Sequence, residues 1–179
     1  MFDITKDFEF CYGHRVWSQK LATGFSDDGL CKCRHLHGHN ATLKVTAVAD
    51  KLDMQGMVTD FKNLDFVKKF IDQHIDHKFL MDSADPLMTH FLSQSPYGLL
   101  YNEKYEFWTV SEMNKTVKTL TAHEQELYES FVVVSFVPTS ENIAKWLYGI
   151  IATKLHEINV TLKSVTIYET PKSCSTYSK

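Results

Sequence analysis

The sequence predicts an α+β domain in which an antiparallel sheet is covered by helices on one face. Three observations predict it. First, apolar and polar residues alternate in three segments, which is typical of strands. Second, two stripes of apolar residues with helical spacing lie between the second and the third of these segments. Third, the resulting order of elements is strand, strand, helix, helix, strand. A chain of 179 residues has the length of one ordinary domain, so residues 1–179 are expected to form a single domain.

The first two strands are predicted from alternation with a period of two. In residues 7–16, DFEFCYGHRV, one face carries apolar side chains and a histidine: Phe8, Phe10, Tyr12, His14 and Val16. In residues 37–49 one face carries two histidines followed by apolar side chains: His37, His39, Ala41, Leu43, Val45 and Ala47. This pattern is typical of strands that bury one face.

Two helices are predicted from apolar stripes. Asp60 is a typical N-cap for the first, which is expected to run to about Ile75. Its stripe consists of Leu64, Val67, Ile71 and Ile75. The second follows VPTSEN, with Thr139 or Ser140 as its cap and Glu141 in its first turn. Its stripe consists of Ile143, Leu147, Ile150, Ile151 and Leu155.

The remaining segments are a last strand and a region that fits the pattern poorly. The run KSVTIYET alternates again and places Val165, Ile167 and Glu169 on one face. Residues 84–133 carry many acidic side chains and are expected to form an acidic insertion, with a strand near residues 105–111.

Three histidines are expected to converge. On a strand, residues two apart project to the same face, so His37 and His39 point together, and His14 lies on the apolar face of the preceding strand. If those strands pair, the result is three imidazoles with an open fourth position, as in catalytic zinc sites. Copper, iron and nickel also accept imidazole. The alternative is three ordinary histidines, although two imidazoles so close gain little without a cation between them.

Two thiols precede the histidine pair. Cys31 and Cys33 could be soft metal ligands, but three histidines and a thiolate would make a closed, structural site. We therefore expect a thiol near the metal that acts as base or nucleophile. Cys11 faces away from His14 by parity and is expected to be a small packing residue.

Asp76-His77 and Glu169 are further candidates. A carboxylate beside an imidazole can orient it for proton transfer, although Asp76-His77 is also consistent with an exposed helix end. Glu169 ends an apolar face and needs a partner, which a ligand with paired N–H donors, a lysine or a backbone amide would supply.

An ordered set of short motifs covers most of the chain: FCYGHRV, CRHLHGHN, VTDF, IDHKFL, PTSENIAKW and YET. This set resembles the family of 6-pyruvoyltetrahydropterin synthases and 6-carboxytetrahydropterin synthases. The resemblance implies a T-fold, a four-stranded antiparallel sheet with two helices on one face, and assembly as homotrimers or hexamers. It implies zinc held by the three histidines, a cysteine base, a proton shuttle at Asp76 and His77, and Glu169 as the pterin-binding residue.

Two branches of the family differ in the spacing before HGH. Queuosine-pathway enzymes resemble C-x3-HGH, which Cys33 satisfies, and tetrahydrobiopterin-pathway enzymes resemble C-x5-HGH, which Cys31 satisfies. We favour Cys33, since CRHLHGH resembles the queuosine-type motif. The implied reaction converts 7,8-dihydroneopterin triphosphate to 6-carboxy-5,6,7,8-tetrahydropterin, with release of acetaldehyde and triphosphate. The triphosphate should need cationic neighbours, but neither of the two arginines, Arg15 and Arg34, is assigned to it.

Three alternatives remain. The first is a 6-pyruvoyltetrahydropterin synthase that releases triphosphate and leaves the side chain intact. The second is a zinc hydrolase with an HxH motif, although such enzymes need a barrel of roughly 250 residues, longer than this chain. The third is a non-catalytic module that binds zinc or a pterin, in which the thiols and the Asp-His pair would have no role.

Composition limits the partners and the compartment. The net charge of −3 favours neither nucleic acid nor an anionic membrane as a partner. The sequence contains no apolar run near the roughly 18–20 residues that span a bilayer, and MFDITKDFEF does not resemble a secretory signal. Four cysteines are too few for a disulfide scaffold, so reduced thiols and a cytoplasmic location are expected.

Overall fold

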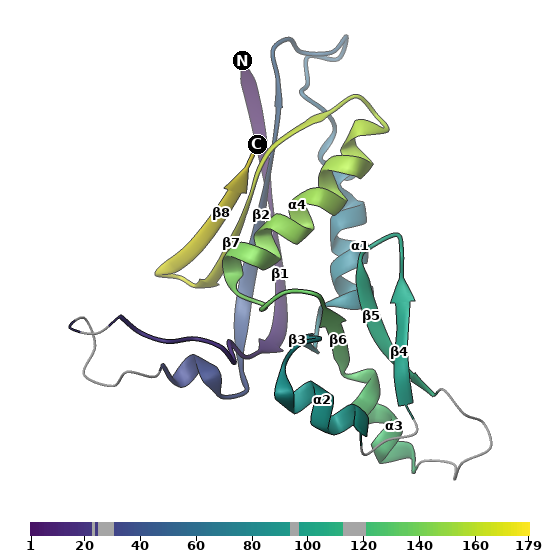
Figure 1. Ribbon diagram of the computed structural model, residues 1–179. Coiled ribbons are helices and arrows are strands. Elements are labelled where there is room, and N and C mark those ends of the chain that lie inside the picture. The colour runs from purple at the N-terminus through teal and green to yellow at the C-terminus, as the bar shows by residue number, and fades with distance from the viewer. Residues whose placement is uncertain (23, 25–30, 94–96, 113–120) are drawn as a thin grey trace. The chain divides into compact units, whose positions relative to one another are not determined.

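The computed structural model describes residues 1–22, 24, 31–93, 97–112 and 121–179. The strands are β1 Phe2–His14, β2 His37–Ala49, β3 Lys78–Asp82, β4 Tyr97–Asn102, β5 Phe107–Glu112, β6 Phe131–Val134, β7 Thr161–Thr170 and β8 Ser173–Ser178. The α-helices are α1 Asp65–His74, α2 Pro86–Ser93, α3 Ala122–Glu129 and α4 Ser140–His156. Short 3-10 turns cover Lys32–Arg34 and Phe61–Leu64. The predicted α+β class is confirmed (Figure 1).

The sheet differs from the expected one. Its eight strands lie in the order β4-β5-β6-β3-β1-β2-β7-β8. Strands β2 and β7, like β7 and β8, pair antiparallel, whereas β3 pairs parallel with both β1 and β6. The expectation of a four-stranded antiparallel sheet is therefore wrong. Strands β3 (KFLMD) and β6 (FVVV) are short, mostly buried runs without alternation, and parallel strands covered on both faces have such sequences.

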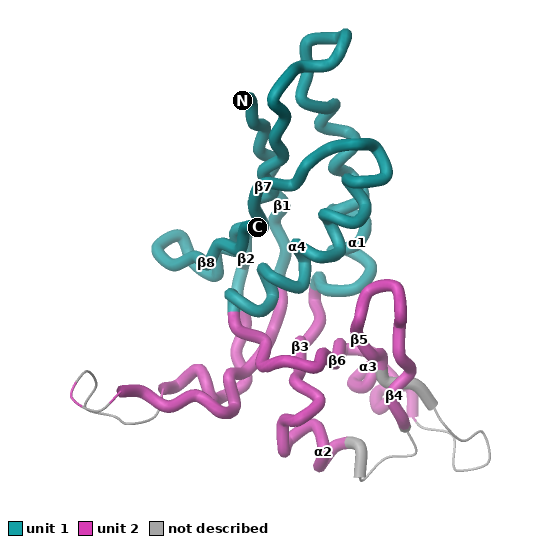
Figure 2. Tube along the Cα trace, turned by 45° about the horizontal axis from the view of Figure 1, so that its top comes forward, with its two compact units in different colours: residues 1–11, 39–76, 140–179 teal, residues 12–38, 77–139 magenta. Residues whose placement is uncertain are grey.

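The chain divides into two compact units, which Figure 2 colours separately. The first consists of residues 1–11, 39–76 and 140–179, and the second of residues 12–38 and 77–139.

The first unit packs α1 and α4 with strands of the sheet. In β2 the side chains of Ala41, Leu43, Val45 and Ala47 are buried, as the alternation predicts. Helix α4 contacts β7 and β8. It buries a stripe of side chains spaced about one turn apart, namely Ile143, Leu147, Ile151 and Leu155. The hydroxyl of Tyr148 donates to the Leu162 carbonyl at 3.0 Å, and the rings of Phe70 and Trp146 join α1 to α4. Asp60 is a cap as predicted, although it begins a 3-10 turn and α1 starts only at Asp65.

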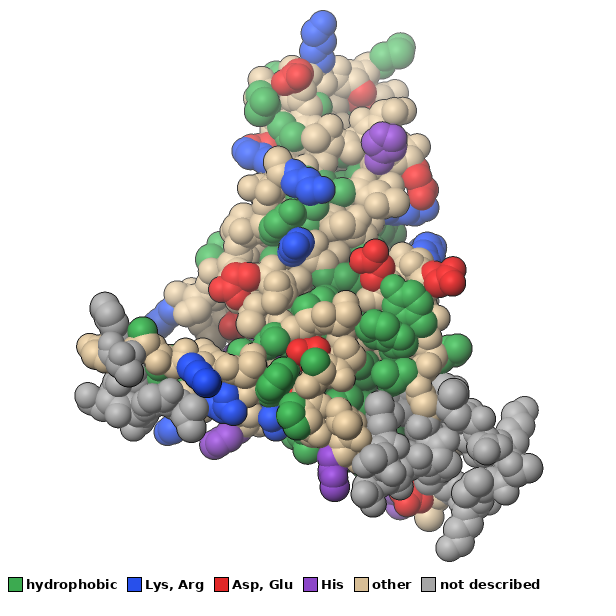
Figure 3. Space-filling view, in the orientation of Figure 1, with side chains coloured by type: hydrophobic (Ala, Val, Ile, Leu, Met, Phe, Trp, Pro, Cys, Tyr) green, Lys and Arg blue, Asp and Glu red, His purple; other side chains and the backbone are tan. Residues whose placement is uncertain are grey.

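The second unit includes the segment that was expected to be an insertion. Residues 84–133 supply β4, β5, α2 and α3 and most of β6, so this segment is an integral part of the sheet. Its residues Met88, Phe131 and Val133 form a buried core together with Met81 of β3. The strand expected near residues 105–111 is β5. Hydrophobic side chains gather on the surface over β4 and β5 (Figure 3), where Leu100 and Tyr101 are exposed.

Candidate metal centre and neighbouring catalytic groups

Three histidines from β1 and β2 come together. His14 is the last residue of β1 and is 2% exposed, while His37 begins β2 and His39 follows two residues later. The ring centroids of His14 and His37 are 4.5 Å apart. One ligand atom from each of the three residues lies within 4.8 Å of the others. The structure thus places together the side chains that the strand pattern puts on one face, and such a set could hold a metal ion.

Backbone carbonyls fix the tautomers of two of these rings. Nδ1 of His14 lies 2.6 Å from the carbonyl oxygen of Pro138, and Nδ1 of His37 lies 2.8 Å from that of His35. A carbonyl oxygen only accepts, so in each neutral ring Nδ1 carries the proton and the lone pair is on Nε2. Metal-binding histidines are commonly oriented in this way. The donor set therefore fits zinc, which takes three imidazoles and keeps a fourth position open.

Gly38 separates the two histidines of β2 for a steric reason. A Cβ atom built on Gly38 would lie 3.0 Å from the carbonyl oxygen of Tyr12. This oxygen is a backbone atom, so a change of side-chain rotamer cannot relieve the contact. The absence of a side chain therefore lets the HGH segment approach β1 closely. The glycine of the HGH motif is the sequence signal for this close approach.

The two candidate thiols lie in one short turn. Cys31 caps the turn Lys32–Arg34, since its Sγ accepts a hydrogen bond from the Cys33 N–H at 3.5 Å, and the two Sγ atoms are 3.2 Å apart. This backbone hydrogen bond, followed by the one from the Cys33 thiol, holds the pKa of Cys31 below its ordinary value. The Cys33 carbonyl accepts from the N–H of Val16 at 2.8 Å, which ties the turn to the segment just after His14.

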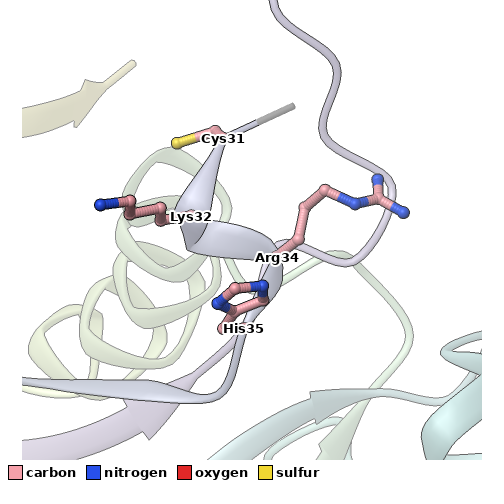
Figure 4. A pocket seen from close by; sticks show the side chains of 4 residues that line it. All are labelled: Cys31, Lys32, Arg34 and His35. Carbon is pink, nitrogen blue, oxygen red and sulfur yellow. The ribbon is translucent and has the colours of Figure 1, made fainter. Parts of the chain in front are cut away.

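A cavity of about 270 Å³ lies at this turn, lined by Cys31, Lys32, Arg34 and His35. In Figure 4 the side chains of Cys31 and Lys32 point to one side of the turn, and the guanidinium of Arg34 points to the other. Nη1 of Arg34 donates to the carbonyl of Gln19 at 2.9 Å. The thiol of Cys31 and the ammonium group of Lys32 therefore lie on the same side of the turn.

Asp76 and His77 follow α1 and have a neighbour that the sequence analysis missed. Oδ1 of Asp76 accepts the backbone N–H of Cys11 at 2.8 Å. The Cys11 thiol donates to Oδ1 of Asn40 at 3.1 Å, and ligand atoms of Cys11, Asp76 and His77 lie within 4.8 Å of one another. Cys11 is thus a half-buried thiol beside a carboxylate, rather than a packing residue. Its parity, shared with the charged Asp7 and Glu9, was the available signal.

Glu169 lies at an irregularity in β7. The pairing of β7 with β8 shifts between Tyr168 and Thr170, so Glu169 is the extra residue of a bulge. Val165 and Ile167 on the same strand are fully buried, while Glu169 is half-buried. Because bulges redirect side chains and are frequent near active sites, the position is consistent with a ligand-binding carboxylate.

Arg15 is engaged in an ion pair. Its Nε lies 3.0 Å from Oδ2 of Asp85, whose side chain is only 1% exposed. The other carboxylate oxygen of Asp85 accepts the N–H of Leu87 in the first turn of α2. Arg15 therefore compensates a buried charge, which is a structural role.

Comparisons with known proteins connect this site to a family. A sequence model of the family described as 6-pyruvoyl tetrahydropterin synthase matches residues 3–179. A protein of Aquifex aeolicus named 6-carboxy-5,6,7,8-tetrahydropterin synthase is 30% identical over 186 residues, which cover 99% of this chain and 98% of the relative. A protein of Rickettsia conorii with the same name is 30% identical, and the match covers 96% of each chain.

Solved structures agree with the sequence matches. An uncharacterised protein from Wolinella succinogenes has a TM-score of 0.87 at 42% identity, covering 99% of this chain and 98% of the other. The 6-pyruvoyl tetrahydropterin synthase of Caenorhabditis elegans has a TM-score of 0.54 at 22% identity, covering 99% and 95%, and this likeness shows a shared fold. The fold and the match over nearly the whole sequence show that the chain belongs to the 6-pyruvoyl tetrahydropterin synthase family.

Proposed function

We propose that the protein converts 7,8-dihydroneopterin triphosphate to 6-carboxy-5,6,7,8-tetrahydropterin in the queuosine (7-deazapurine) pathway, with release of acetaldehyde and triphosphate. The observation that carries the proposal is the histidine triad, in a chain whose curated relatives are named for this product. The side-chain carbon that stays on the pterin carries one oxygen in the substrate and two in the carboxyl group of the product, so the reaction also consumes one water.

His14, His37 and His39 would hold one zinc ion. When bound, zinc would supply Lewis-acid polarisation of the hydroxyl and carbonyl oxygens of the substrate side chain. The buried position of His14 and its bond to Pro138 would keep its ring in place while substrate exchanges.

The remaining roles fall to side chains around the triad. Cys33, as thiolate, would take a proton from the substrate side chain. His77, next to Asp76, would carry a second proton. The carboxylate of Glu169 would accept hydrogen bonds from the ring N–H and amino group of the pterin, which match its two oxygens.

The test is to incubate zinc-loaded protein with dihydroneopterin triphosphate and to identify the pterin product by mass. Acetaldehyde is followed by a coupled alcohol dehydrogenase, with metal-stripped protein as the control. The proposal expects acetaldehyde to appear in step with substrate loss. Triphosphate release without acetaldehyde, together with a product that keeps its three-carbon side chain, would overturn it.

A second candidate reaction has one observation in its favour. Cys31 satisfies the C-x5-HGH spacing, and the pKa of this thiol is lowered mainly by the Cys33 N–H. A base at Cys31 would favour a 6-pyruvoyltetrahydropterin synthase, which releases triphosphate only. The product mass separates the two reactions.

Assembly and location belong to the same proposal. We propose a homotrimer or hexamer, because β4 and β8 are edge strands of the sheet and edge strands generally need cover. Light scattering that finds an active monomer would contradict this. In the part of the chain that the structure describes, no helix is long and apolar enough to cross a membrane. A cytoplasmic location and the lack of a nucleic-acid partner stay predictions.

A further inference from the structure

Cys31 and Cys33 are held in a geometry close to that of a disulfide. Their Sγ atoms are 3.2 Å apart, and both residues are half-buried, reduced cysteines. The Cys33 N–H donates to Sγ of Cys31, so the cap of the turn itself directs the first sulfur toward the second residue. A bond between the sulfurs needs a separation of about 2.05 Å, so they would have to approach by only about 1 Å.

The backbone permits this closure. Residues two apart in sequence have Cα atoms at most about 7 Å from each other, even in a fully extended chain. Bridged cysteines usually have Cα atoms about 4.4–6.8 Å apart, and the turn Lys32–Arg34 shortens the span further. The ring that forms encloses a single intervening residue, Lys32, so little chain entropy is lost.

We propose that Cys31 and Cys33 are a thiol oxidation site that closes to an intramolecular disulfide in reaction with a low-molecular-weight disulfide and thereby switches the catalytic site off. In the first step the Cys31 thiolate attacks one sulfur of the oxidant, breaks its S–S bond and releases one thiolate. In the second step Cys33, as thiolate, attacks Sγ of Cys31 and releases the other. Two electrons pass from the two cysteines to the oxidant, which leaves as two thiols after taking up the two cysteine protons.

The turn explains why Cys31 would react first. The Cys33 N–H donates to its sulfur and the Cys33 thiol lies 3.2 Å from it, and these two contacts lower the pKa of Cys31. The Lys32 ammonium lies on the same side of the turn (Figure 4). Cys33 then lies beside the mixed disulfide as the resolving thiol.

The loss of activity rests on the proposed function, in which Cys33 is the base, whereas disulfide formation does not. Once Cys33 is bonded to Cys31 it has no thiolate to accept a proton. A ring of this size is strained, and strained disulfides are readily reduced, so the change should be reversible.

Lys32 makes the test direct. Zinc-loaded protein is treated with oxidised glutathione, remaining thiols are alkylated, and trypsin cleaves after Lys32 and Arg34. In reduced protein the fragments 21–32 and 33–34 separate and both are alkylated. In oxidised protein they should stay joined, with two hydrogen atoms fewer and no alkyl group. Joined fragments support the proposal. Alkylation of both cysteines, or a separate glutathione on each, overturns it.

Variants and activity complete the test. Cys33→Ser should stop at a stable glutathione adduct on Cys31, because the resolving thiol is missing. Cys174→Ser is the matched control, since Cys174 is exposed on β8, and should still form the joined fragments.

Pterin formation should fall more than tenfold on oxidation and return with dithiothreitol. Unchanged turnover in disulfide-containing protein would overturn the switch. If reduced, zinc-loaded protein forms no pterin product at all, the proposed function fails, while the fragment assay still decides the oxidation site.

Discussion

Nδ1 of His14 lies 2.6 Å from the carbonyl oxygen of Pro138, although the two residues are 124 positions apart in sequence. Both residues belong to the second unit, and the contact with this carbonyl fixes the orientation of a buried imidazole. A second carbonyl, that of His35, fixes His37 in the same tautomer. Each of these rings therefore directs the lone pair of Nε2, rather than Nδ1, toward a ligand.

This arrangement predicts one zinc ion per subunit. Because three ligands share the ion, His14→Ala, His37→Ala and His39→Ala should each weaken zinc binding by at least about 100-fold. Competition with a chelator of known affinity measures the change. His123→Ala is the control, since its side chain is 95% exposed, and should bind zinc like the unchanged protein. Full zinc retention in both His37→Ala and His39→Ala would refute the site.

Gly38→Ala should disturb the site without removing a ligand. Its new Cβ would meet the Tyr12 carbonyl at 3.0 Å, so we expect a loss of about 1–3 kcal/mol in the free energy of unfolding together with weaker zinc binding. Gly149→Ala is the control, because nothing lies within 4 Å of its added Cβ in α4 and it should gain about 0.5–1 kcal/mol. Urea unfolding checks both, and equal effects of the two substitutions would contradict the steric argument.

His77 is held in the left-handed region, with φ at 59°. Glycine adopts this conformation without the Cβ penalty, so His77→Gly should be more stable than His77→Ala by about 1 kcal/mol. Both variants lack the imidazole and should lose most turnover. Asp72, which is exposed within α1, provides the control. Asp72→Gly should be less stable than Asp72→Ala, since glycine weakens a helix relative to alanine. Thermal unfolding of the four variants decides the question.

The two arginines should respond differently to substitution. Arg15→Met leaves Asp85 buried without its cation and should cost about 3 kcal/mol of stability. Arg34→Met removes a charged donor from the Gln19 carbonyl but leaves no buried charge unpaired, and it should cost less, about 1.5 kcal/mol. Comparison of urea midpoints at one pH tests this, and the reverse order would show that Arg34 is the structural residue.

The sequence predicted those parts of the fold in which one face is buried and the other is not. Strand β2 has the predicted bounds, and α4 buries most of the predicted stripe. An element that buries only one face has apolar residues that recur with the period of the strand or helix, so the sequence shows it. Strands β3 and β6 are largely buried runs that have no period to read. Strand β8, SCSTYS, is an edge strand without a buried residue and has no apolar alternation either.

The candidate site was predictable where its residues share a strand or neighbouring strands. His37 and His39 are two residues apart, so their common direction follows from strand geometry alone. The contact of Cys11 with Asp76 depends on how a strand and the end of a helix 65 residues later are placed, which local periodicity does not specify. The contact between Cys31 and Cys33 was only partly predictable. The C-x-C spacing permits such a contact, but the turn Lys32–Arg34 is needed to bring the two sulfur atoms together.

The last prediction assigns the base. Cys33→Ala should abolish turnover while zinc stays bound, because the three histidines are intact, whereas Cys31→Ala should lower turnover only mildly. In Cys33→Ala the pKa of Cys31 should rise part of the way to its ordinary value, since the thiol donor is lost but the backbone N–H remains. The Cys31 thiolate, followed by its absorbance near 240 nm with Cys31→Ser as the blank, should therefore appear at higher pH than in the unchanged protein. If instead Cys31→Ala abolishes turnover and Cys33→Ala keeps it, Cys31, the thiol with the lowered pKa, is the base. The C-x5-HGH spacing then applies, and the product to expect is 6-pyruvoyltetrahydropterin with no acetaldehyde.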